Sequence, residues 1–532
     1  MRRALLVVVA GLLLAACGTA TGPPPLTLRV LAGSELADMA PVLDEAAEAT
    51  GVRLELQYTG TLEGADTVAA GRADGTTDAL WFSSNRYLET IPAARDRVDT
   101  ATRIMGSPVV LGVRAERARE LGWDRAPVTW SQVAEAASTG RFAFGMTDPS
   151  SSNSGFSALV AVAAALDGSG RVLDPAAVDR VTGPLAAFFA GQRLTSGSSG
   201  WLTDAYVRRA TGGDGGPPLD GVVTYEASIL ELNRSGRLPE PLTLVVPSDG
   251  VVSAEYPLTL LRSASPEARA GLARLTEHLR RPEVQQRIVE TTARRAGVPG
   301  VAPPPEAART TLVELPFPTD KATLDALLTT YLDRVRRPAR TVYVLDVSGS
   351  MQGTRIDGLR TALIGLTGSD PSLTNQFRRF RSREDVVFVP FSDAPGAPEP
   401  FSVDPADPQP SRDAIATRVR ALAAGGNTAV YGSLEAAYRY LDQAAAADPD
   451  RLTTVVLLSD GESNRGPRLP EFRAFLAGRP PSTRGVPVFP ILFGEAARGE
   501  MEQLAAATGG RTFAASDPQA LDAVFREIRG YQ

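Results

Sequence analysis

The chain contains few of the residues on which most hydrolase active sites depend. Its 532 residues include one histidine, His278, and one cysteine, Cys17. A lone histidine in an amphipathic helical pattern, with no thiol elsewhere, argues against hydrolases that use a histidine base or a cysteine nucleophile. No carboxylate pair falls in a recognisable catalytic spacing. We therefore expect a protein that binds rather than one that catalyses.

Excess positive charge and long apolar runs are also missing. The net charge is −6, which does not favour nucleic acid as a partner. Beyond the first residues, no stretch approaches the roughly 18 uncharged apolar residues of a membrane-spanning helix. With 43% hydrophobic and 22% charged residues, the composition is globular. The length predicts two or three domains.

The N-terminal residues show the pattern of an exported protein. Two arginines precede an apolar run at residues 5–16 that is too short to span a membrane, and Leu14-Ala15-Ala16-Cys17 ends it. This segment resembles the lipobox of bacterial lipoproteins, which implies cleavage before Cys17 and acylation of that cysteine. We expect a signal peptide over residues 1–16, a tether over residues 17–25, and a lipid anchor at the extracytoplasmic face of the cell membrane. No cysteine then remains for a disulfide.

Residues 26–300 alternate between strand and helix patterns, which predicts an α/β domain with parallel sheets. Apolar or alternating runs predict strands at residues 28–31, 53–58, 78–82, 109–113, 222–225 and 242–246. Amphipathic runs predict helices at residues 35–50, 130–137, 156–166, 266–279 and 282–294. Ser34 and Thr129 are the expected N-caps of the first two helices.

The order of these elements resembles that of type II periplasmic solute-binding proteins. Three segments carry the resemblance: Gly33-Ser34 after the first strand, Ser83-Ser84-Asn85 after another, and the turn DPSSSNSG at residues 148–155. It implies two lobes that clamp a ligand, with helix N-termini that favour an anion. The predicted ligand-binding residues are Ser34, Ser83, Ser84, Ser152, Asn153, Ser154, Tyr225 and Glu226. No arginine or lysine is obviously aimed at this cleft, so three alternatives stay open: a neutral polar solute, an oxyanion held by backbone groups, and a cleft that has lost its solute.

A proline-rich joint, VAPPPE at residues 301–306, follows the first domain. Residues 312–317 are expected to form a strand packed on one of the two domains. Asp320 is the predicted N-cap of a helix over residues 322–336, whose apolar side should pack between the domains. Residues 301–338 are thus predicted to be a linker with a helix.

The most informative segment is TVYVLDVSGSMQG, at residues 341–353. Its apolar start predicts a buried strand, and a second buried strand is expected at residues 453–459. Because the C-terminal ends of parallel strands meet at one edge of a sheet, the polar residues after them should converge. Together with a glycine-containing loop at residues 425–428, these segments supply five oxygen donors: Asp346, Ser348, Ser350, Thr428 and Asp460. Such donors suit Mg²⁺, which takes octahedral oxygen ligands at about 2.0–2.1 Å.

These segments resemble the von Willebrand factor A (VWA) domain and its metal-ion-dependent adhesion site, over residues 339–532. The resemblance implies a doubly wound, Rossmann-like fold in which Ser348, Ser350 and often Thr428 ligate Mg²⁺, Mn²⁺ or Ca²⁺ directly. It implies that Asp346 and Asp460 act through bound waters, and that an acidic residue of a partner protein fills one open position. We expect the metal loop to be exposed, and the strand at residues 385–391 to be antiparallel or at the sheet edge.

Three functions fit this organisation. The first is a membrane-anchored binding lipoprotein whose VWA domain binds a protein partner and whose first domain binds or senses a solute. The second is the solute receptor of an ABC importer with the VWA unit as a docking accessory. The third, an accessory of an ATP-driven motor, conflicts with an extracytoplasmic location, where ATP is absent.

Overall fold

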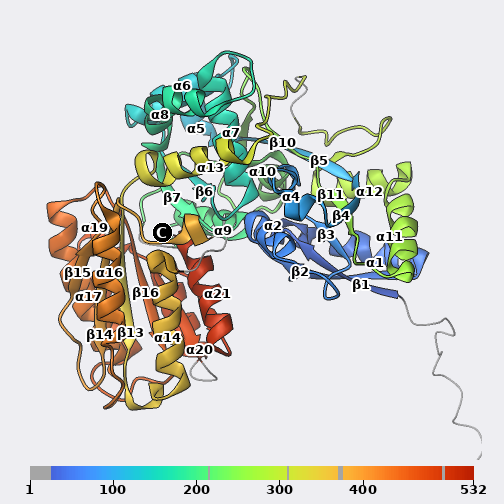
Figure 1. Cartoon of the computed structure of the whole chain (residues 1–532). Coiled ribbons are helices and arrows are strands. Elements are labelled where there is room, and N and C mark those ends of the chain that lie inside the picture. Colours follow the sequence, from blue (N-terminus) through green and yellow to red (C-terminus); the bar gives the residue numbers. More distant parts are fainter. Residues whose placement is uncertain (1–25, 214–215, 308–310, 370–374, 494–497, 532) are drawn as a thin grey trace, which may run out of the picture.

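The computed structural model describes residues 26–213, 216–307, 311–369, 375–493 and 498–531. Its strands form three separate sheets with helices around them, so the chain is an α/β protein built from three units (Figure 1). We call these units lobe 1, lobe 2 and the C-terminal domain. Cys17 and the predicted signal peptide lie outside the described residues. Within these ranges, no helix has the length and apolar character needed to cross a membrane.

Lobe 1 is built on a five-stranded sheet with the order β2-β1-β3-β11-β4. Its strands are β1 (Leu26–Ala32), β2 (Val52–Tyr58), β3 (Ala79–Trp81), β4 (Val98–Arg103) and β11 (Pro257–Leu261). Its helices are the 3-10 helix η1 (Ser34–Met39), α1 (Ala40–Thr50), α2 (Thr61–Ala69), α3 (Arg86–Glu89), α4 (Pro92–Arg95), α11 (Pro266–Leu279) and α12 (Pro282–Thr292). β1 pairs parallel with β2 and β3, but β11 pairs antiparallel with β3 and β4.

Lobe 2 is built on a seven-stranded sheet with the order β10-β5-β8-β6-β7, to which β9 and β12 add by pairing with β5. Its strands are β5 (Met105–Arg114), β6 (Phe144–Thr147), β7 (Gln192–Ser196), β8 (Gly221–Tyr225), β9 (Leu242–Val245), β10 (Ser253–Ala254) and β12 (Arg295–Ala296). Its helices are α5 (Ala115–Leu121), α6 (Trp130–Ser138), α7 (Asn153–Asp167), α8 (Pro175–Phe189), α9 (Ser199–Ala210) and α10 (Glu226–Arg234).

The α/β class is as expected, but the strands that connect the lobes pair antiparallel rather than parallel. β5 follows β4 with only Ile104 between them, and it pairs antiparallel with β8 and β9. β11 likewise follows β10 without an intervening helix. A parallel pair needs a crossover connection, usually a helix, so strands that pass directly from one lobe to the other enter their sheets antiparallel.

One of the two predicted caps of the first domain is present. The Thr129 side chain accepts a hydrogen bond from Gln132 N, and the Gln132 side chain accepts one from Thr129 N at 2.9 Å, which completes a capping box. Ser34 is not the cap of a regular helix: it begins η1, and α1 starts only at Ala40, directly before Pro41. Proline suits the first turn of a helix because its missing N–H has no partner there anyway.

Between the lobes and the C-terminal domain lies α13 (Lys321–Thr330), which continues as the π-helix η2 (Tyr331–Val335). Asp320 is its cap, as predicted, and accepts from Thr323 N at 2.8 Å. The helix packs on α8 of lobe 2, with the Tyr331 and Phe189 rings 4.9 Å apart. The described residues 312–317 form no strand, which corrects our expectation. Only Glu314 makes a bridge, to Val251, because Pro316 and Pro318 have no N–H to extend a ladder.

The C-terminal domain is built on a six-stranded sheet with the order β15-β14-β13-β16-β17-β18. Its strands are β13 (Ala339–Asp346), β14 (Glu384–Phe391), β15 (Glu399–Ser402), β16 (Leu452–Ser459), β17 (Val488–Phe493) and β18 (Phe513–Ala515). Its helices are η3 (Gly349–Met351), α14 (Thr354–Ile364), η4 (Gly365–Ser369), α15 (Asn375–Arg378), α16 (Pro408–Arg420), α17 (Val430–Ala447), α18 (Leu469–Ala477), α19 (Pro481–Arg484), α20 (Arg498–Thr508), α21 (Pro518–Ile528) and η5 (Arg529–Tyr531).

This sheet has helices on both faces, which makes it doubly wound. Val342 and Val344 of β13 join the apolar cluster that contains α17, and the alternate residues Tyr343 and Leu345 join the cluster that contains α14 and α21. β14 pairs parallel with β13 and antiparallel with β15, so our expectation holds for one of its two neighbours, but β14 is not an edge strand. The edge strand is β15, which is antiparallel to β14 and too short and polar to give a strand signal in the sequence.

The C-terminal domain packs closely against lobe 2. The ring of Trp201 in α9 lies 5.0 Å from that of Tyr531 and 6.0 Å from that of Phe489. In Figure 1, α21 (red) lies on the side of the C-terminal domain that faces the lobes. A Cβ atom on Gly530 would lie 2.7 Å from Gly197 Cα, so a glycine is required at this contact.

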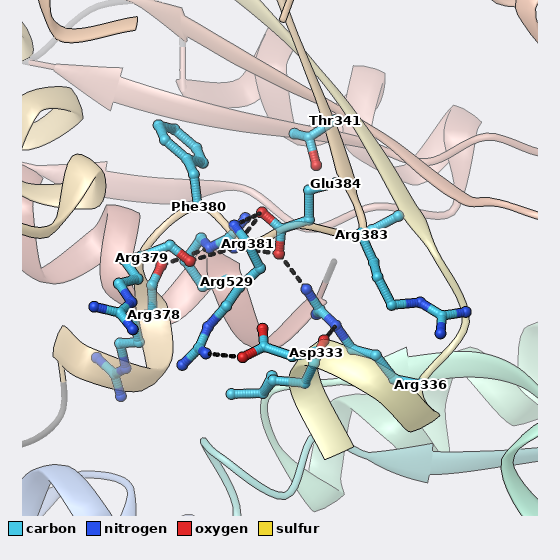
Figure 2. Close-up of polar contacts among 12 residues, drawn as sticks. Asp333, Arg336, Thr341, Arg378, Arg379, Phe380, Arg381, Arg383, Glu384 and Arg529 are labelled. Carbon is cyan, nitrogen blue, oxygen red and sulfur yellow. Dashed lines mark hydrogen bonds and ion pairs between the residues drawn. The ribbon is translucent and has the colours of Figure 1, made fainter. Parts of the chain in front are cut away.

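A buried carboxylate, Glu384, ties the linker helix to the C-terminal domain (Figure 2). Its side chain is 3% exposed and forms ion pairs with Arg336, at the end of the linker helix, and with Arg529, after α21. Arg529 Nη2 lies 2.5 and 2.6 Å from the two carboxylate oxygens. Burial alone would raise the pKa of Glu384, but Arg529 and Arg336 lower it below its usual value.

Candidate functional site

The predicted metal residues lie at the C-terminal edge of the six-stranded sheet, where two neighbouring parallel strands end. β13 ends at Asp346 and β16 at Ser459, directly before Asp460, and the two strands pair along their length. Their all-apolar centres are buried, which fixes the direction in which the polar ends emerge. The loop before α17, which carries Thr428, closes over the same edge.

Hydrogen bonds join four of the five predicted residues. Ser348 N donates to Asp346 Oδ1 at 2.9 Å, and the hydroxyl oxygens of Ser348 and Ser350 are 3.0 Å apart. Ser350 Oγ donates to Asp460 Oδ1 at 2.7 Å. An octahedron with metal–oxygen distances of about 2.0–2.1 Å has edges of about 2.9 Å. The 3.0 Å separation of the Ser348 and Ser350 hydroxyl oxygens therefore matches that of neighbouring ligands around Mg²⁺.

The Thr428 loop is fastened to the Ser348–Ser350 turn through the backbone. Gly349 N donates to Gly426 O at 2.9 Å, and Gly425 N donates to Val347 O at 2.8 Å. On its other side, Thr428 N donates to the side-chain oxygen of Asn464 at 2.9 Å. The fold thus brings Thr428 to the same edge as the other four residues, and Asn464 holds it there.

The sheet edge that carries the five predicted metal residues, which we call the metal edge, is less exposed than we expected. Asp346 is fully buried and Asp460 is 6% exposed, whereas Ser350 is exposed at the surface. Ser459, which the sequence did not single out, donates its hydroxyl to Asp346 Oδ2 at 2.6 Å. Burial raises the pKa of Asp346, and the nearby Asp460 adds to that rise although Ser459 and Ser348 oppose it. Asp346 is therefore part of the protein interior as well as of the site.

Arg355, at the start of α14, is a further member of this site. Its guanidinium donates to Asp460 Oδ2 and, at 3.3 Å, to the carbonyl oxygen of Ser350. Asp460 Oδ1 thus accepts from the Ser350 hydroxyl, and Asp460 Oδ2 accepts from the Arg355 guanidinium. Nothing local in the sequence signals this pairing, because the partner lies 105 residues away.

The donor set fits a hard divalent cation. The described residues contain no cluster of three or more His, Cys, Asp or Glu side chains that could hold a metal. This site instead combines two carboxylates with three hydroxyls, a mixture that leaves Mg²⁺ favoured over Zn²⁺, which prefers nitrogen and sulfur ligands.

A second candidate site is a cleft of about 1020 Å³ between the two lobes, which the C-terminal domain borders as well. Four of the predicted ligand residues line it: Ser34, Ser83, Ser152 and Asn153. The lobes touch at one point of the cleft, where a Cβ atom on Gly60 of lobe 1 would lie 2.5 Å from Ser151 O of lobe 2. A glycine at residue 60 is what permits this approach.

The other four predicted ligand residues do not line the cleft. Ser84 accepts from Arg86 N, and Ser154 bonds to Thr147 and Ser199 inside lobe 2. Tyr225 accepts from Asn153 Nδ2 at 2.9 Å, so it supports a lining residue from behind. Glu226 is buried in an ion pair with Arg295, whose two nitrogens lie 2.8 and 2.9 Å from its carboxylate oxygens.

A comparison with known families identifies the unit that carries the metal edge. Residues 342–527 match the family model of the von Willebrand factor type A domain. The match runs from β13 to α21 and includes all five predicted metal residues. A solved structure of von Willebrand factor type A from Catenulispora acidiphila covers 37% of this chain and 43% of its own length, at 19% identity and a TM-score of 0.28.

The two lobes are similar to solved periplasmic binding proteins. AfuA from Actinobacillus pleuropneumoniae, solved with fructose-6-phosphate, aligns at 12% identity and a TM-score of 0.43, covering 58% of this chain and 98% of its own. Iron-bound HitA from Pseudomonas aeruginosa aligns at 15% identity and a TM-score of 0.42, covering 57% and 97%. These are similarities of fold. No curated protein sequence matches the chain.

Our expectation that no arginine faces the cleft is wrong. Arg72 of lobe 1, Arg208 of lobe 2, and Arg378 and Arg511 of the VWA domain all line it. Two of these four come from the VWA domain, because α15 and the segment between α20 and β18 meet the lobes there. The sequence of the first domain does not show that the VWA domain supplies part of the cleft wall.

Proposed function

We propose that this chain is an extracytoplasmic binding protein with two binding sites. Its VWA domain binds an acidic residue of a partner protein through a divalent metal, and its lobes bind a small solute. The observation that carries the first part is the set of joined oxygens at Ser348, Ser350 and Asp460. The exposure of Ser350, next to buried Asp346 and Ser348, leaves one side of the site open to a partner.

In this proposal Ser348, Ser350 and Thr428 hold Mg²⁺, with Mn²⁺ or Ca²⁺ as substitutes, while Asp346 and Asp460 act through water. The metal would supply a positive centre that accepts a partner carboxylate. Asn464 positions Thr428, and Ser459 orients Asp346. Arg355 neutralises part of Asp460, which leaves the bound metal with more positive charge for the incoming carboxylate.

Partner binding should depend on both the metal and Ser350. Immobilised full-length protein, incubated with a surface-protein extract, should retain a partner in Mg²⁺ and release it in EDTA. The variant Ser350→Ala removes one metal ligand without touching the core, so retention should fall about tenfold or more. Retention that is equal with EDTA, and equal in Ser350→Ala, would contradict a metal-dependent mode of binding.

We further propose that lipid on Cys17 anchors the protein to the extracytoplasmic face of the cell membrane. The support is the sequence LAAC at residues 14–17 after a charged start and a short apolar run. Cells fed a fatty-acid analogue should label the wild-type protein and leave Cys17→Ser unlabelled. Equal labelling of the two proteins would place the lipid elsewhere or rule out this anchor.

The proposed solute site rests on the geometry of the cleft. Its volume of about 1020 Å³ is close to the upper limit of small-molecule sites, about 300–1,000 Å³. α2 and α7 begin on its walls, at Thr61 and Asn153, and neither helix has a side-chain cap. Backbone N–H groups at such helix starts are free to bind a solute oxygen.

A further inference from the structure

The VWA domain contributes a buried cation, Arg378, to the wall of the solute cleft. The Arg378 side chain is 3% exposed, and its Nη2 lies 3.5 Å from Glu63 Oε2 on α2 of lobe 1. Its other two nitrogens, Nε and Nη1, have no hydrogen-bond acceptor among the described residues. A buried guanidinium with one long ion pair is poorly compensated for the water that it has lost.

The other arginines of the cleft are better satisfied. Arg72 donates to Asp66 at 2.9 Å, and Arg208 donates to the carbonyl oxygen of Gly509 at 3.2 Å. Arg511 donates to Glu527 at 3.1 Å and to the Tyr531 hydroxyl at 2.9 Å. Arg208 also has one buried nitrogen without an acceptor, but Arg378 has two, so among the described residues Arg378 is the cleft cation with the largest unmet capacity to donate.

All three units meet at Ser151, in the same cleft that Arg378 lines. Gly60 of lobe 1 approaches Ser151 O, and a Cβ atom on Gly530 of the VWA domain would lie 2.8 Å from Ser151 Oγ. Ser151 lines the cleft, is 7% exposed, and its hydroxyl has no hydrogen-bond partner among the described residues. The uncapped starts of α2 and α7 lie at the same place. Two buried side-chain donors, Arg378 of the VWA domain and Ser151 of lobe 2, thus lack an acceptor among the described residues.

We propose that the cleft takes an oxyanion, a phosphate or a carboxylate group of a small solute, and that Arg378 of the VWA domain binds it in exchange for Glu63. The proposal rests on the solute-binding function stated above and names its ligand class. A ligand oxygen would give Arg378 and Ser151 the acceptors that they lack. Glu63 would be released because two anionic groups cannot share one guanidinium without repelling each other.

This arrangement would couple the solute to the VWA domain. Arg378 O accepts a hydrogen bond from Arg529 Nε at 2.8 Å, and Arg529 also pairs with Glu384 in the domain core. Figure 2 shows Arg378 extending away from this Glu384 cluster. A solute that binds Arg378 therefore favours the present docking of the VWA domain on the lobes, and by linkage the docking favours the solute.

Calorimetric titration of the full-length protein with four probes tests the proposal: inorganic phosphate, citrate, glucose 6-phosphate and neutral glucose. At least one oxyanion should bind, and comparing the affinities for the phosphates with that for citrate shows whether the cleft prefers a phosphate or a carboxylate group. Arg378→Gln should weaken that binding about tenfold or more, because it removes a charged donor. Arg378→Lys should retain part of the affinity. The control Arg379→Gln removes the same charge one residue away, outside the cleft, and should stay within about twofold of wild type.

Glu63→Gln separates a ligand role from a structural one. Removing the competing carboxylate should strengthen oxyanion binding about threefold or more, since the repulsion across the cleft disappears. If Arg378 and Glu63 merely hold the domains together, Glu63→Gln should weaken binding or leave it unchanged, and that result overturns the proposal. Equal oxyanion affinity in wild type and Arg378→Gln, or binding of glucose alone, also overturns it. If none of the four probes binds, the solute function itself is contradicted, and the oxyanion site with it.

Discussion

Replacing Glu384 with alanine should lower the free energy of unfolding by about 3–5 kcal/mol. The carboxylate is 3% exposed, and it pairs with Arg336 and Arg529, whose side chains are 4% and 6% exposed. It also accepts from Arg381 N at 3.2 Å. Removing it would leave two buried guanidinium groups without their main counter-charge, and water cannot replace it in the interior.

Urea denaturation of the wild type and Glu384→Ala measures this effect. A matched control is Glu399→Ala, which breaks the ion pair with Arg418, where both side chains are about one-third exposed (29% and 31%). A partly exposed pair is worth roughly 0.2–1 kcal/mol, so the control should cost little. If Glu384→Ala lowers the free energy of unfolding by less than about 1 kcal/mol, or if both variants lower it equally, the Glu384 ion pairs do not stabilise the fold as we expect.

The same cluster predicts how stability changes with pH. Arg529 and Arg336 lower the pKa of Glu384 in the folded chain, whereas the pKa of a glutamate in an unfolded chain is about 4.3. Its contribution to stability is therefore fully present above that pH and is lost as the pH falls through the lowered folded pKa. The difference in stability between wild type and Glu384→Ala should shrink below about pH 4.

Asp346→Asn should weaken Mg²⁺ binding by about 100-fold, at the upper end for a group that acts on a metal through water. The asparagine keeps an oxygen that can accept from Ser348 N but removes the negative charge. Alanine is a poorer choice, because buried Asp346 also accepts from Ser459 Oγ, and an unpaired hydroxyl would cost about 1–3 kcal/mol. Calorimetry with Mg²⁺ or Mn²⁺ on the full-length protein gives the affinity.

Glu462→Gln is the control for this measurement. Glu462 is exposed, two residues after Asp460, so the variant removes the same charge from the same edge of the sheet. Its Mg²⁺ affinity should stay within about threefold of wild type, because an exposed charge is screened by water and salt. Equal losses in both variants would mean that overall charge, rather than a site at Asp346, attracts the cation.

The sequence predicts well that these polar residues meet at one edge of the sheet, because that information is local. Buried strands show as β-branched runs, and the residues that follow them must emerge at one edge of a parallel sheet. Asp346, Ser348, Ser350 and Asp460 therefore come together as the pattern implies. Ser459 escaped notice because it ends the apolar strand.

The cleft was predicted less well because its walls come from distant parts of the chain. Arg378 and Glu63 are more than three hundred residues apart, and no local periodicity marks their encounter. The antiparallel return of β11 into lobe 1 is likewise a property of the connection between lobes, which strand patterns do not encode. Tyr225 and Glu226 are polar, as ligand-binding residues often are, but their side chains accept hydrogen bonds from Asn153 and Arg295 instead of lining the cleft.

Anomalous diffraction from crystals of the full-length protein grown with Mn²⁺ tests the central proposal most directly, because it locates the ion without any variant. We expect one peak at the C-terminal edge of the VWA sheet, with the oxygens of Ser348, Ser350 and Thr428 within about 2.0–2.3 Å. Asp346 and Asp460 should lie behind ordered waters, with one position open or filled by an added carboxylate. A peak elsewhere, or none at this edge under saturating Mn²⁺, would contradict a metal-dependent binding site here.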